Sequence, residues 1–292
     1  MSRTFVIGAR GSRLSLRQVE LVSAALRAAR PDVRLAVREI HTEGDRSGAP
    51  LAQIGGLGVF TKAIEDALLA GDADIAIHSM KDLPTALADG LTIAAVPPRE
   101  DVRDTLVTRD GRTLAELPRG ARIGTGSGRR AVQVRALRPD VETAEIRGNV
   151  DTRIRKVETG EYDGAVLALA GLSRLGLTQK AGQVFSVDEM LPAVGQGALA
   201  IEVRAADAEA LALAALIDDT HTRVAVEAER AYLARLGGGC RQPVGAHAVV
   251  NGDELALRVM IEHEGGRIAR AEVRGRASEA AALGVRAAEM VM

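Results

Sequence analysis

The only cysteine of the chain, Cys240, follows three consecutive glycines and stands three residues before Pro243. A single glycine after a helix is an ordinary C-terminal cap, and residues 223–236 have the apolar spacing of a buried helix face. Three glycines in a row favour a loop whose backbone is approached closely by something bulky. Cys240 is therefore a candidate attachment point or nucleophile. The alternative, a capping turn before an inert buried thiol, is equally open at this point.

A second candidate is the glycine-rich turn 124–128, which is followed directly by Arg129 and Arg130. Such a turn between a strand and a helix directs backbone N–H groups and the positive end of the helix dipole toward an anion. It lacks the Gly-Lys-Ser/Thr ending of a Walker loop. Two guanidinium groups favour a carboxylate instead, because their forked donors match its two oxygens. A solvated helix start is the alternative.

More polar and basic side chains stand near the expected ends of strands. Asn149 is expected to cap a helix flanked by two arginines, and an arginine and a serine occupy the matching place near residue 10. Any one of these cations would more often be a solvated surface charge. Together they predict a cleft for a polyanion, lined by Arg10, Ser12, Arg129, Arg130, Arg147, Arg153 and Arg174.

One carboxylate interrupts this basic set. Lys81 and Asp82 follow residues 74–77, which have the composition of a central buried strand. An exposed ion pair between the two, worth about 1 kcal/mol or less, is the plainer interpretation. In a basic cleft, however, cationic neighbours keep a carboxylate ionised, and such a group can stabilise a developing cation. The combination favours a substrate with many carboxylates that reacts through a cation.

The expected elements bring these residues to one edge of a sheet. A helix from about Ser15, with Ser15 and Gln18 as a capping box, separates strand candidates at 5–7 and 33–37. This alternation predicts an α/β domain with a largely parallel sheet. Ligands of such sheets bind beyond the carboxyl ends of the strands.

Two proline-containing segments, the polar residues 97–101 and the glycine-containing residues 191–197, are candidate boundaries. A second α/β pattern lies between them. Residues 199–217 fit either neighbour. From about residue 221, a helix, an antiparallel hairpin around 255–261 and a final Ala-rich helix predict a small α+β unit that carries Cys240.

Composition excludes several other classes of protein. The net charge is −1 and aromatic residues are 2% of the chain, with no Trp, so no nucleic-acid partner is expected. No apolar segment is long enough to span a bilayer, and the first residues do not resemble a signal peptide. The five histidines lack metal-ligand spacing, and one cysteine builds no thiolate cage. We expect a cytoplasmic protein without a structural metal or membrane association.

Seven segments, spread over nearly the whole chain, resemble the porphobilinogen deaminase (hydroxymethylbilane synthase) family. Several are long and specific to that family, such as the run His78-Ser79-Met80-Lys81-Asp82 and its flanks. The matching segments are residues 10–12, 76–84, 129–130, 147–150, 170–177, 191–198 and 238–240.

The resemblance implies an α/β fold of two periplasmic-binding-protein-like lobes with a double chain crossover, plus a small C-terminal α+β domain. Domain 1 would comprise residues 1–98 and 198–217 and carry the catalytic aspartate. Domain 2, residues 99–197, would bind the carboxylates of cofactor and substrate. Domain 3, residues 218–292, would carry the cofactor-attachment cysteine. We expect a monomer.

By resemblance, Cys240 holds a dipyrromethane cofactor through a thioether, and four porphobilinogen molecules are joined onto it with loss of ammonia. Hydrolysis then releases hydroxymethylbilane for haem and other tetrapyrroles, so the enzyme would be a transferase. Asp82 would be catalytic, accepting pyrrole N–H bonds and stabilising the cation left when ammonia departs. The cofactor would be held by Cys240, Lys81, Asp82, Ser127, Arg129 and Arg130. The substrate would be held by Arg10, Ser12, Gln18, Arg147, Arg153 and Arg174.

Several positions depart from the family pattern, among them Arg241 and Gln242, which are less usual after the cysteine. Gly126 replaces one serine of a Ser-Ser pair, Gly128 stands where relatives have a larger aliphatic residue, and Leu57 stands where many have Lys. Two other functions compete with this interpretation. A two-lobed carboxylate-binding protein without catalysis would need neither a central aspartate nor a displayed thiol. A phosphate-handling enzyme using residues 124–128 would lack the Walker lysine.

Overall fold

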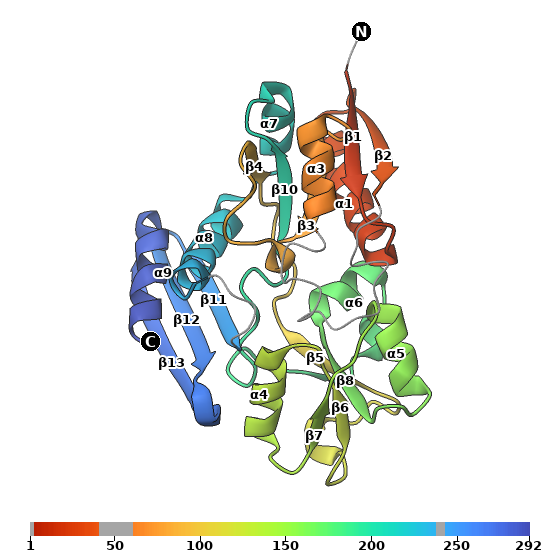
Figure 1. The fold of residues 1–292 in the computed structure, drawn as a ribbon, viewed down its shortest axis with the longest axis vertical. Coiled ribbons are helices and arrows are strands. Elements are labelled where there is room, and N and C mark those ends of the chain that lie inside the picture. Colours follow the sequence, from red (N-terminus) through yellow and green to blue (C-terminus); the bar gives the residue numbers. More distant parts are fainter. Residues whose placement is uncertain (1–2, 41–60, 238–242) are drawn as a thin grey trace. The chain divides into compact units, whose positions relative to one another are not determined.

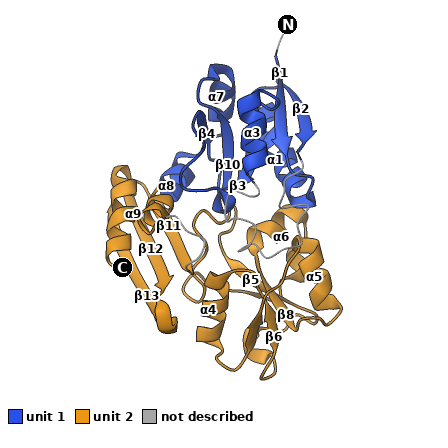
Figure 2. Ribbon diagram, in the orientation of Figure 1, with its two compact units in different colours: residues 1–99, 198–226 blue, residues 100–197, 227–292 orange. Residues whose placement is uncertain are grey.

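The computed structural model describes residues 3–40, 61–237 and 243–292 (Figure 1). The chain forms two compact units: unit 1 comprises residues 1–99 and 198–226, and unit 2 comprises residues 100–197 and 227–292 (Figure 2). It passes between the units at 99–100, at 197–198 and inside helix α8 (Thr220–Arg235). The predicted attachment residue Cys240, and Leu57, lie outside the described residues.

Unit 1 is built on a five-stranded sheet of order β2-β1-β3-β10-β4. Strands β1, β2 and β3 are parallel, and β10 is antiparallel to both of its neighbours. The strands expected at 5–7, 33–37 and 74–77 are confirmed to within two residues. The elements of unit 1 are β1 (Thr4–Ala9), α1 (Arg13–Ala29), β2 (Arg34–Glu39), α3 (Lys62–Ala70), β3 (Ile75–Ser79), β4 (Leu91–Ala95), β10 (Leu199–Arg204) and α7 (Ala208–Ala215).

Alternate residues of β3 pack on opposite faces of this sheet, as the period of two in a strand requires. Ile75 and Ile77 belong to the apolar cluster that contains the buried face of α1. Ala76 belongs instead to the cluster that contains Ile64 and Leu68 of α3. The two helices therefore cover the two faces of the sheet, and β3 is buried between them.

Helix α1 begins at Arg13, earlier than the start predicted near Ser15. Ser12 is the N-cap residue, and its Oγ accepts a hydrogen bond from the Ser15 N–H at 3.3 Å. The predicted capping box of Ser15 and Gln18 is wrong, because Ser12 takes the capping position. Gln18 faces the sheet, is 3% exposed, and donates from Nε2 to Ser79 Oγ at 2.9 Å.

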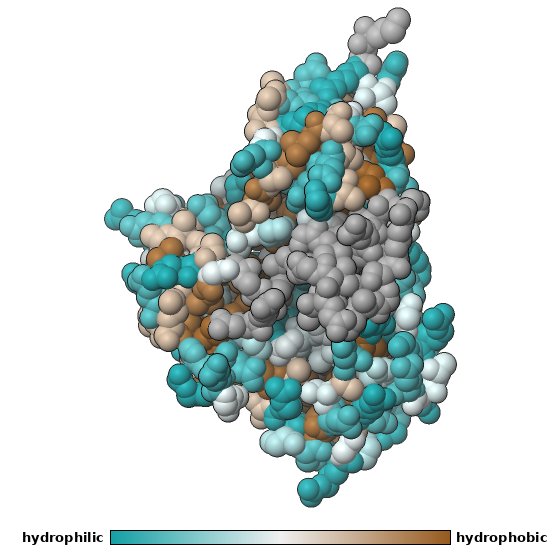
Figure 3. Space-filling view, viewed as in Figure 1, coloured by the Kyte–Doolittle hydropathy of each residue, from teal (hydrophilic) through white to brown (hydrophobic). Residues whose placement is uncertain are grey.

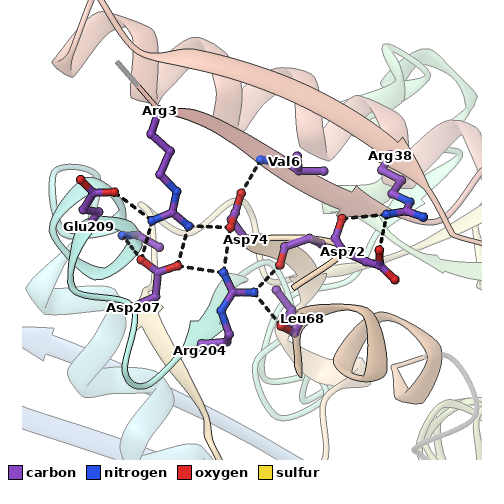
Figure 4. A network of polar contacts seen from close by, with 11 residues as sticks. Arg3, Val6, Arg38, Leu68, Asp72, Asp74, Arg204, Asp207 and Glu209 are labelled. Carbon is purple, nitrogen blue, oxygen red and sulfur yellow. Dashed lines mark hydrogen bonds and ion pairs between the residues drawn. The ribbon is translucent and has the colours of Figure 1, made fainter. Parts of the chain in front are cut away.

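An ionic network closes the amino-terminal edge of the unit 1 sheet (Figure 4). Arg3 precedes β1, Asp74 precedes β3, Arg204 ends β10, and Asp207 caps α7. Arg3 Nη2 lies 2.6 Å from Asp74 Oδ1 and 2.7 Å from Asp207 Oδ2. Arg204 Nη2 lies 2.7 Å and 2.8 Å from the same two oxygens. Hydrogen bonds from Arg3 outweigh burial and hold the pKa of Asp207 well below its ordinary value.

Unit 2 contains a second five-stranded sheet, of order β7-β6-β8-β5-β9. Strands β6, β7 and β8 are parallel, and β5 is antiparallel to both β8 and β9. The elements are β5 (Asp104–Thr108), β6 (Arg122–Gly124), α4 (Gly128–Leu137), β7 (Glu142–Ala144), α5 (Val150–Glu158), β8 (Gly164–Ala168), α6 (Leu169–Leu175) and β9 (Gln183–Val184).

The two five-stranded sheets have the same plan. Each has three parallel strands, then an antiparallel strand, then an edge strand. The antiparallel strand is β10 in unit 1 and β5 in unit 2, and each is the first strand after the chain crosses between units. Residues 199–217 thus belong to unit 1. The predicted α/β fold of two lobes with a double crossover and a small α+β domain is confirmed.

The C-terminal residues form an antiparallel sheet of β11 (Val244–Asn251), β12 (Glu254–Glu262) and β13 (Ile268–Arg276), against which α9 (Ala280–Glu289) packs. The second half of α8 packs here too: fully buried Tyr232 donates its hydroxyl to the Met260 carbonyl oxygen at 2.8 Å. A Cβ atom on Gly284 of α9 would overlap the carbonyl oxygen of Ala228, so the two helices approach closely only with glycine there. This sheet groups with unit 2, and the three-domain boundaries stay a prediction.

Among the described residues on the face drawn in Figure 3, apolar residues appear in several groups between hydrophilic ones. In the part of the chain that the structure describes, no helix is both long and apolar enough to cross a membrane. Within residues 3–40, 61–237 and 243–292, no group of three or more His, Cys, Asp or Glu side chains is placed to hold a metal ion.

Candidate active site

Two arginines and one aspartate form a buried cluster in unit 2. Arg129 and Arg130 lie in the first turn of α4, and Asp104 is the first residue of β5. The Asp104 side chain is 0% exposed, and those of Arg129 and Arg130 are 4% and 7% exposed. Nη1 of Arg129 lies 2.7 Å from Asp104 Oδ2, and Nη2 of Arg130 lies 2.7 Å from Asp104 Oδ1. One carboxylate thus serves two guanidinium groups.

The cluster carries a net positive charge. Burial by itself raises the pKa of Asp104, but the charges of Arg129 and Arg130 outweigh burial and hold that pKa well below its ordinary value. Burial lowers the pKa of Arg129, and the charge of Asp104 opposes that shift. Arginine side chains in proteins are in general permanently charged. Two positive charges therefore face one negative charge in a buried place.

The two guanidinium groups differ in how many donors they use. Arg130 donates from Nε and Nη2 to Asp104 and from Nη1 to the Val166 carbonyl oxygen. Arg129 donates from Nη1 to Asp104 and to the Leu191 carbonyl oxygen, the latter at 2.7 Å. Its buried Nε has no hydrogen-bond partner among the described residues. Since an unsatisfied buried donor is costly, Arg129 has capacity for a further acceptor.

Asp104 and Gln196 were missed by the sequence analysis. Gln196 Nε2 donates to Asp104 Oδ1 at 2.9 Å and to the Val102 carbonyl oxygen at 2.7 Å. Asp104 is the first residue of a buried strand and stands two residues before the apolar pair Leu106 and Val107. A lone acid at the start of such a strand needs a partner, and this signal was present in the sequence. Nothing local to Gln196 indicated its contact.

A pocket of about 180 Å³ opens at the N-terminal end of α4. Ser127 is the N-cap residue of that helix, but its side chain makes no capping hydrogen bond. Its backbone N–H donates to Thr125 Oγ1 at 3.1 Å. The lining residues are Thr125, Gly126, Ser127, Gly128, Ala131, Thr143, Ala144 and Glu145. The Ser127 residue therefore borders a space at the positive end of a helix dipole.

Pro243, three residues after Cys240 in the sequence, lies beside the first residue of α4. A Cβ atom on Gly128 would lie 3.2 Å from Cγ of Pro243. That contact is tighter than an ordinary van der Waals contact, so a larger aliphatic residue at position 128 would require Pro243 to move. The departure at Gly128 is thus matched by the proline that occupies the adjoining space.

The start of α5 lies close to two of the predicted arginines. Asn149 caps the helix as predicted, because its Oδ1 accepts the Thr152 N–H at 3.0 Å. Nε of Arg147 lies 2.9 Å from Glu145 Oε1, and Nε of Arg153 donates to the Gly148 carbonyl oxygen at 2.8 Å. Both cations stand after β7, at the carboxyl edge of the parallel strands.

Arg174 lies in α6, directly after β8, at the same edge. It is largely buried and donates from Nη2 to the Gly197 carbonyl oxygen at 2.6 Å. Burial lowers the pKa of Arg174, and the charge of Glu100 opposes the shift. The neighbouring Ser173 Oγ donates to Glu100 Oε2 at 3.0 Å. Arg174 therefore has a structural contact at the crossover in addition to any ligand.

In unit 1, the predicted site residues follow β1 and β3, which are parallel neighbours. Arg10 and Ser12 come directly after β1. Lys81 and Asp82 belong to the short 3-10 helix η2 (Met80–Asp82) after β3. Because the carboxyl ends of parallel strands meet at one edge of a sheet, these residues share that edge. Asp82 is exposed and makes no hydrogen bond or ion pair with the described residues.

The turn that carries Asp82 is held by two buried neighbours. Met80 and Leu83 are 1% and 2% exposed and belong to one apolar cluster with Ala198. The Met80 N–H donates to the Ala198 carbonyl oxygen at 3.0 Å. The buried hydrogen bond from Gln18 to Ser79 lies directly before the turn. An exposed carboxylate is thus presented on a firmly packed turn.

The structure therefore gathers the predicted residues into two groups, one at the carboxyl edge of each sheet. The unit 1 group is Arg10, Ser12, Gln18, Lys81 and Asp82. The unit 2 group is Ser127, Arg129, Arg130, Arg147, Arg153 and Arg174.

Two family models match the chain. The model described as "Porphobilinogen deaminase, dipyromethane cofactor binding domain" matches residues 5–212. The model described as "Porphobilinogen deaminase, C-terminal domain" matches residues 223–292.

Curated relatives match over the full length. A porphobilinogen deaminase of Roseiflexus sp. (strain RS-1) is 50% identical over all of this chain and 97% of its own length. One of Syntrophus aciditrophicus (strain SB) is 49% identical over 98% of this chain and 94% of its own. Among solved structures, the Bordetella pertussis BvgS periplasmic VFT2 domain aligns with a TM-score of 0.42 and 11% identity, covering 73% of this chain and 86% of that one.

Proposed function

Because the chain belongs to the porphobilinogen deaminase family, we propose that the residues of these two groups bind its cofactor and its substrate. Enzymes of this family are hydroxymethylbilane synthases: they join porphobilinogen molecules head to tail onto a dipyrromethane cofactor and release ammonia, in tetrapyrrole biosynthesis. Each pyrrole carries an acetate and a propionate, so the growing product is a polyanion. It needs many cationic partners, and the two groups supply them.

The observation that carries this proposal is the proximity of Gly128 and Pro243. Pro243 is the third residue after Cys240, and three residues span at most roughly 11 Å. The N-terminal end of α4, with Ser127 and Arg129, is therefore within reach of a two-ring group tethered at position 240. We propose that the dipyrromethane is attached to Cys240 through a thioether.

The residues at this end of α4 fit a group that carries carboxylates. Arg129 and Arg130 hold one more charge than Asp104 compensates, and Arg129 has a buried Nε without a partner among the described residues. A carboxylate would supply both the missing acceptor and the missing charge. When bound, the dipyrromethane supplies the electron-rich pyrrole carbon to which the next pyrrole is joined. Its proposed ligands are Cys240, Lys81, Asp82, Ser127, Arg129 and Arg130.

Asp82 is the proposed catalytic residue. Its exposed carboxylate can accept the pyrrole N–H of porphobilinogen, and loss of ammonia from the aminomethyl group leaves positive charge that is shared with that nitrogen. A fixed anion at the nitrogen stabilises the cation more than it stabilises the neutral substrate, which lowers the barrier. Met80 and Leu83 hold the turn, so the carboxylate needs little rearrangement during the reaction.

The remaining residues are proposed for binding the carboxylates of the incoming pyrrole and of the growing product. We assign Arg10, Ser12, Arg147, Arg153 and Arg174 to direct contact. Gln18 is buried against Ser79, so we propose that it supports the site by holding the end of β3.

The proposal is tested by the intact mass of the purified protein, followed by peptide mapping. We expect a mass excess of two linked pyrroles on the peptide that contains Cys240, and no excess in Cys240→Ser. If Cys240 is unmodified in protein that turns over porphobilinogen, the attachment is wrong. Protein that binds porphobilinogen and releases no ammonia, even after incubation with substrate, would instead fit a carboxylate-binding protein without catalysis.

Three further assignments are proposals. The functional domains are residues 1–98 with 198–217, residues 99–197, and residues 218–292, the last supported by its own sheet of β11 to β13. The enzyme acts as a monomer of 30.6 kDa, which light scattering would measure. It works in the cytoplasm without nucleic acid or membrane partners, which its net charge of −1 and single cysteine favour.

A further inference from the structure

We propose that His78 and Glu202 are positioning residues for the turn that carries Asp82; this inference rests on the catalytic role proposed for Asp82. His78 Nε2 lies 2.9 Å from Glu202 Oε2. The His78 side chain is 5% exposed and that of Glu202 is 0% exposed. The pair joins β3, which leads into the turn, to β10, the first strand after the chain returns to unit 1.

The pair fixes how far β3 extends along β10. His78 stands opposite Ala200 in the antiparallel ladder, and Glu202 is two residues further along β10 on the same face. The ladder continues past the strand end, where the Met80 N–H donates to the Ala198 carbonyl oxygen. A slip of one residue would turn the two side chains to opposite faces and break their contact. The contact thus sets the level at which the turn leaves the sheet.

The two last residues of β3 are held on opposite faces of the sheet. His78 binds Glu202 on one face, and Ser79 accepts the hydrogen bond of Gln18 from α1 on the other. The turn begins at the next residue, Met80. Two directional contacts immediately before a catalytic carboxylate limit both the sliding and the tilting of the strand end.

A contribution to stability alone does not account for the pair. It lies between apolar clusters that contain Ala76 on one side and Met80 with Ala200 on the other. Glu202 Oε1 is buried without a hydrogen-bond partner in the described residues. Replacing both partners of a buried hydrogen bond by apolar groups of similar shape is commonly neutral or stabilising. The hydrogen bond between His78 and Glu202 fixes the orientation of the two side chains, which apolar contacts do not do.

The test replaces the pair without leaving a lone buried charge. His78→Leu combined with Glu202→Leu should keep the thermal midpoint of unfolding at or above that of the wild type. It should keep the cofactor on Cys240, measured by intact mass. The kcat for porphobilinogen should fall about 100-fold, because small misplacements of a reacting group are that costly, while KM changes little. Glu202→Gln retains an acceptor for His78 and should recover most of the kcat.

A second variant keeps the test informative if the double replacement folds poorly. Glu202→Asp keeps the charge but draws the carboxylate back by one methylene, so it too should lower kcat. The matched control is Asp74→Asn at the other end of β3, which should lower stability and leave kcat unchanged, since Asp74 is part of the network at the opposite edge (Figure 4).

A purely structural role for the pair would not couple it to Asp82. The coupling between the pair and Asp82 therefore distinguishes a positioning role from a structural one. In an Asp82→Asn background, replacing the pair should lower the residual kcat far less than in the wild type. Additive effects, or wild-type kcat in the folded double variant or in Glu202→Asp, would overturn the inference alone. Wild-type turnover by Asp82→Asn would overturn the catalytic assignment and this inference with it.

Discussion

Arg174 Nη2 donates a 2.6 Å hydrogen bond to the carbonyl oxygen of Gly197, the last residue before the chain returns to unit 1. The N–H of Glu100, the first residue of unit 2 after the other crossing, donates to the same oxygen at 3.2 Å. The two chain connections are therefore joined at one carbonyl group. An arginine that we propose for binding carboxylates also holds this junction, so the backbone there tolerates little change.

We predict that Gly197→Ala is strongly destabilising. Gly197 has a φ of +86°, and a Cβ atom there would overlap the carbonyl oxygen of Glu100. The matched control is Gly176→Ala, where φ is +68° and no atom lies within 4 Å of the added Cβ. The control should cost about 1–2 kcal/mol for the left-handed backbone alone. Urea unfolding should show a clearly larger loss for Gly197→Ala, and equal losses would contradict the steric argument.

A second prediction concerns the anion between the two buried arginines. Asp104→Asn leaves both guanidinium groups without a counter-charge and should lower the free energy of unfolding by about 3–5 kcal/mol at pH 7. It should also reduce cofactor loading, because Arg129 and Arg130 lose the acceptor that orients them. Urea unfolding and intact mass measure the two effects. Full stability with full loading would show that Asp104 is dispensable.

The same carboxylate predicts an acid dependence. The pKa of Asp104 is lowered in the folded protein, so its contribution is present above its unfolded pKa, about 4, and is lost as the pH falls toward the folded value. The unfolding free energy of the wild type should thus fall more steeply than that of Asp104→Asn as the pH drops below about 4, the unfolded pKa. Parallel pH profiles would contradict this assignment.

The α/β plan could be predicted from the sequence because each of its strands and helices has a recognisable local pattern. Strands such as Ile75–Ser79 are short apolar runs, and polar site residues follow them directly, as at Lys81 and Asp82. The resemblance to a family added the double crossover, which no local pattern carries. The pairing of β10 with β3 joins segments more than a hundred residues apart.

Polar contacts between residues that are distant in the sequence could not be predicted from the sequence. Arg129 and Arg130 were predicted as ligands of a polyanion, and their shared partner Asp104 appeared only with the fold, because β5 and α4 are separate elements that pack together. The contact between His78 and Glu202 was not predicted for the same reason. The local sequence around a histidine in a strand is the same whether or not a carboxylate from a distant segment contacts it.

A fourth prediction uses the network at the amino-terminal edge of unit 1 (Figure 4). Asp207→Ala removes ionic contacts to Arg3 and Arg204 and the cap of α7, in which Asp207 Oδ1 accepts the Ala210 N–H at 3.0 Å. Loss of the cap alone should cost about 1 kcal/mol. Asp207→Asn keeps a capping oxygen and should cost less. Neither should alter kcat, since the network lies at the edge away from Asp82, and a lower kcat in both would contradict that separation.

The last prediction tests the proposed catalytic carboxylate. Asp82 is exposed and has no partner among the described residues, so Asp82→Asn should leave the unfolding free energy and the mass of the attached cofactor nearly unchanged. Steady-state release of ammonia should fall about 100- to 1000-fold, the usual cost of removing one group that stabilises charge in a transition state. Asp89→Asn, another exposed acid of unit 1, is the control and should release ammonia at the wild-type rate. If both variants keep that rate, the charge that develops on the pyrrole nitrogen is stabilised by another group.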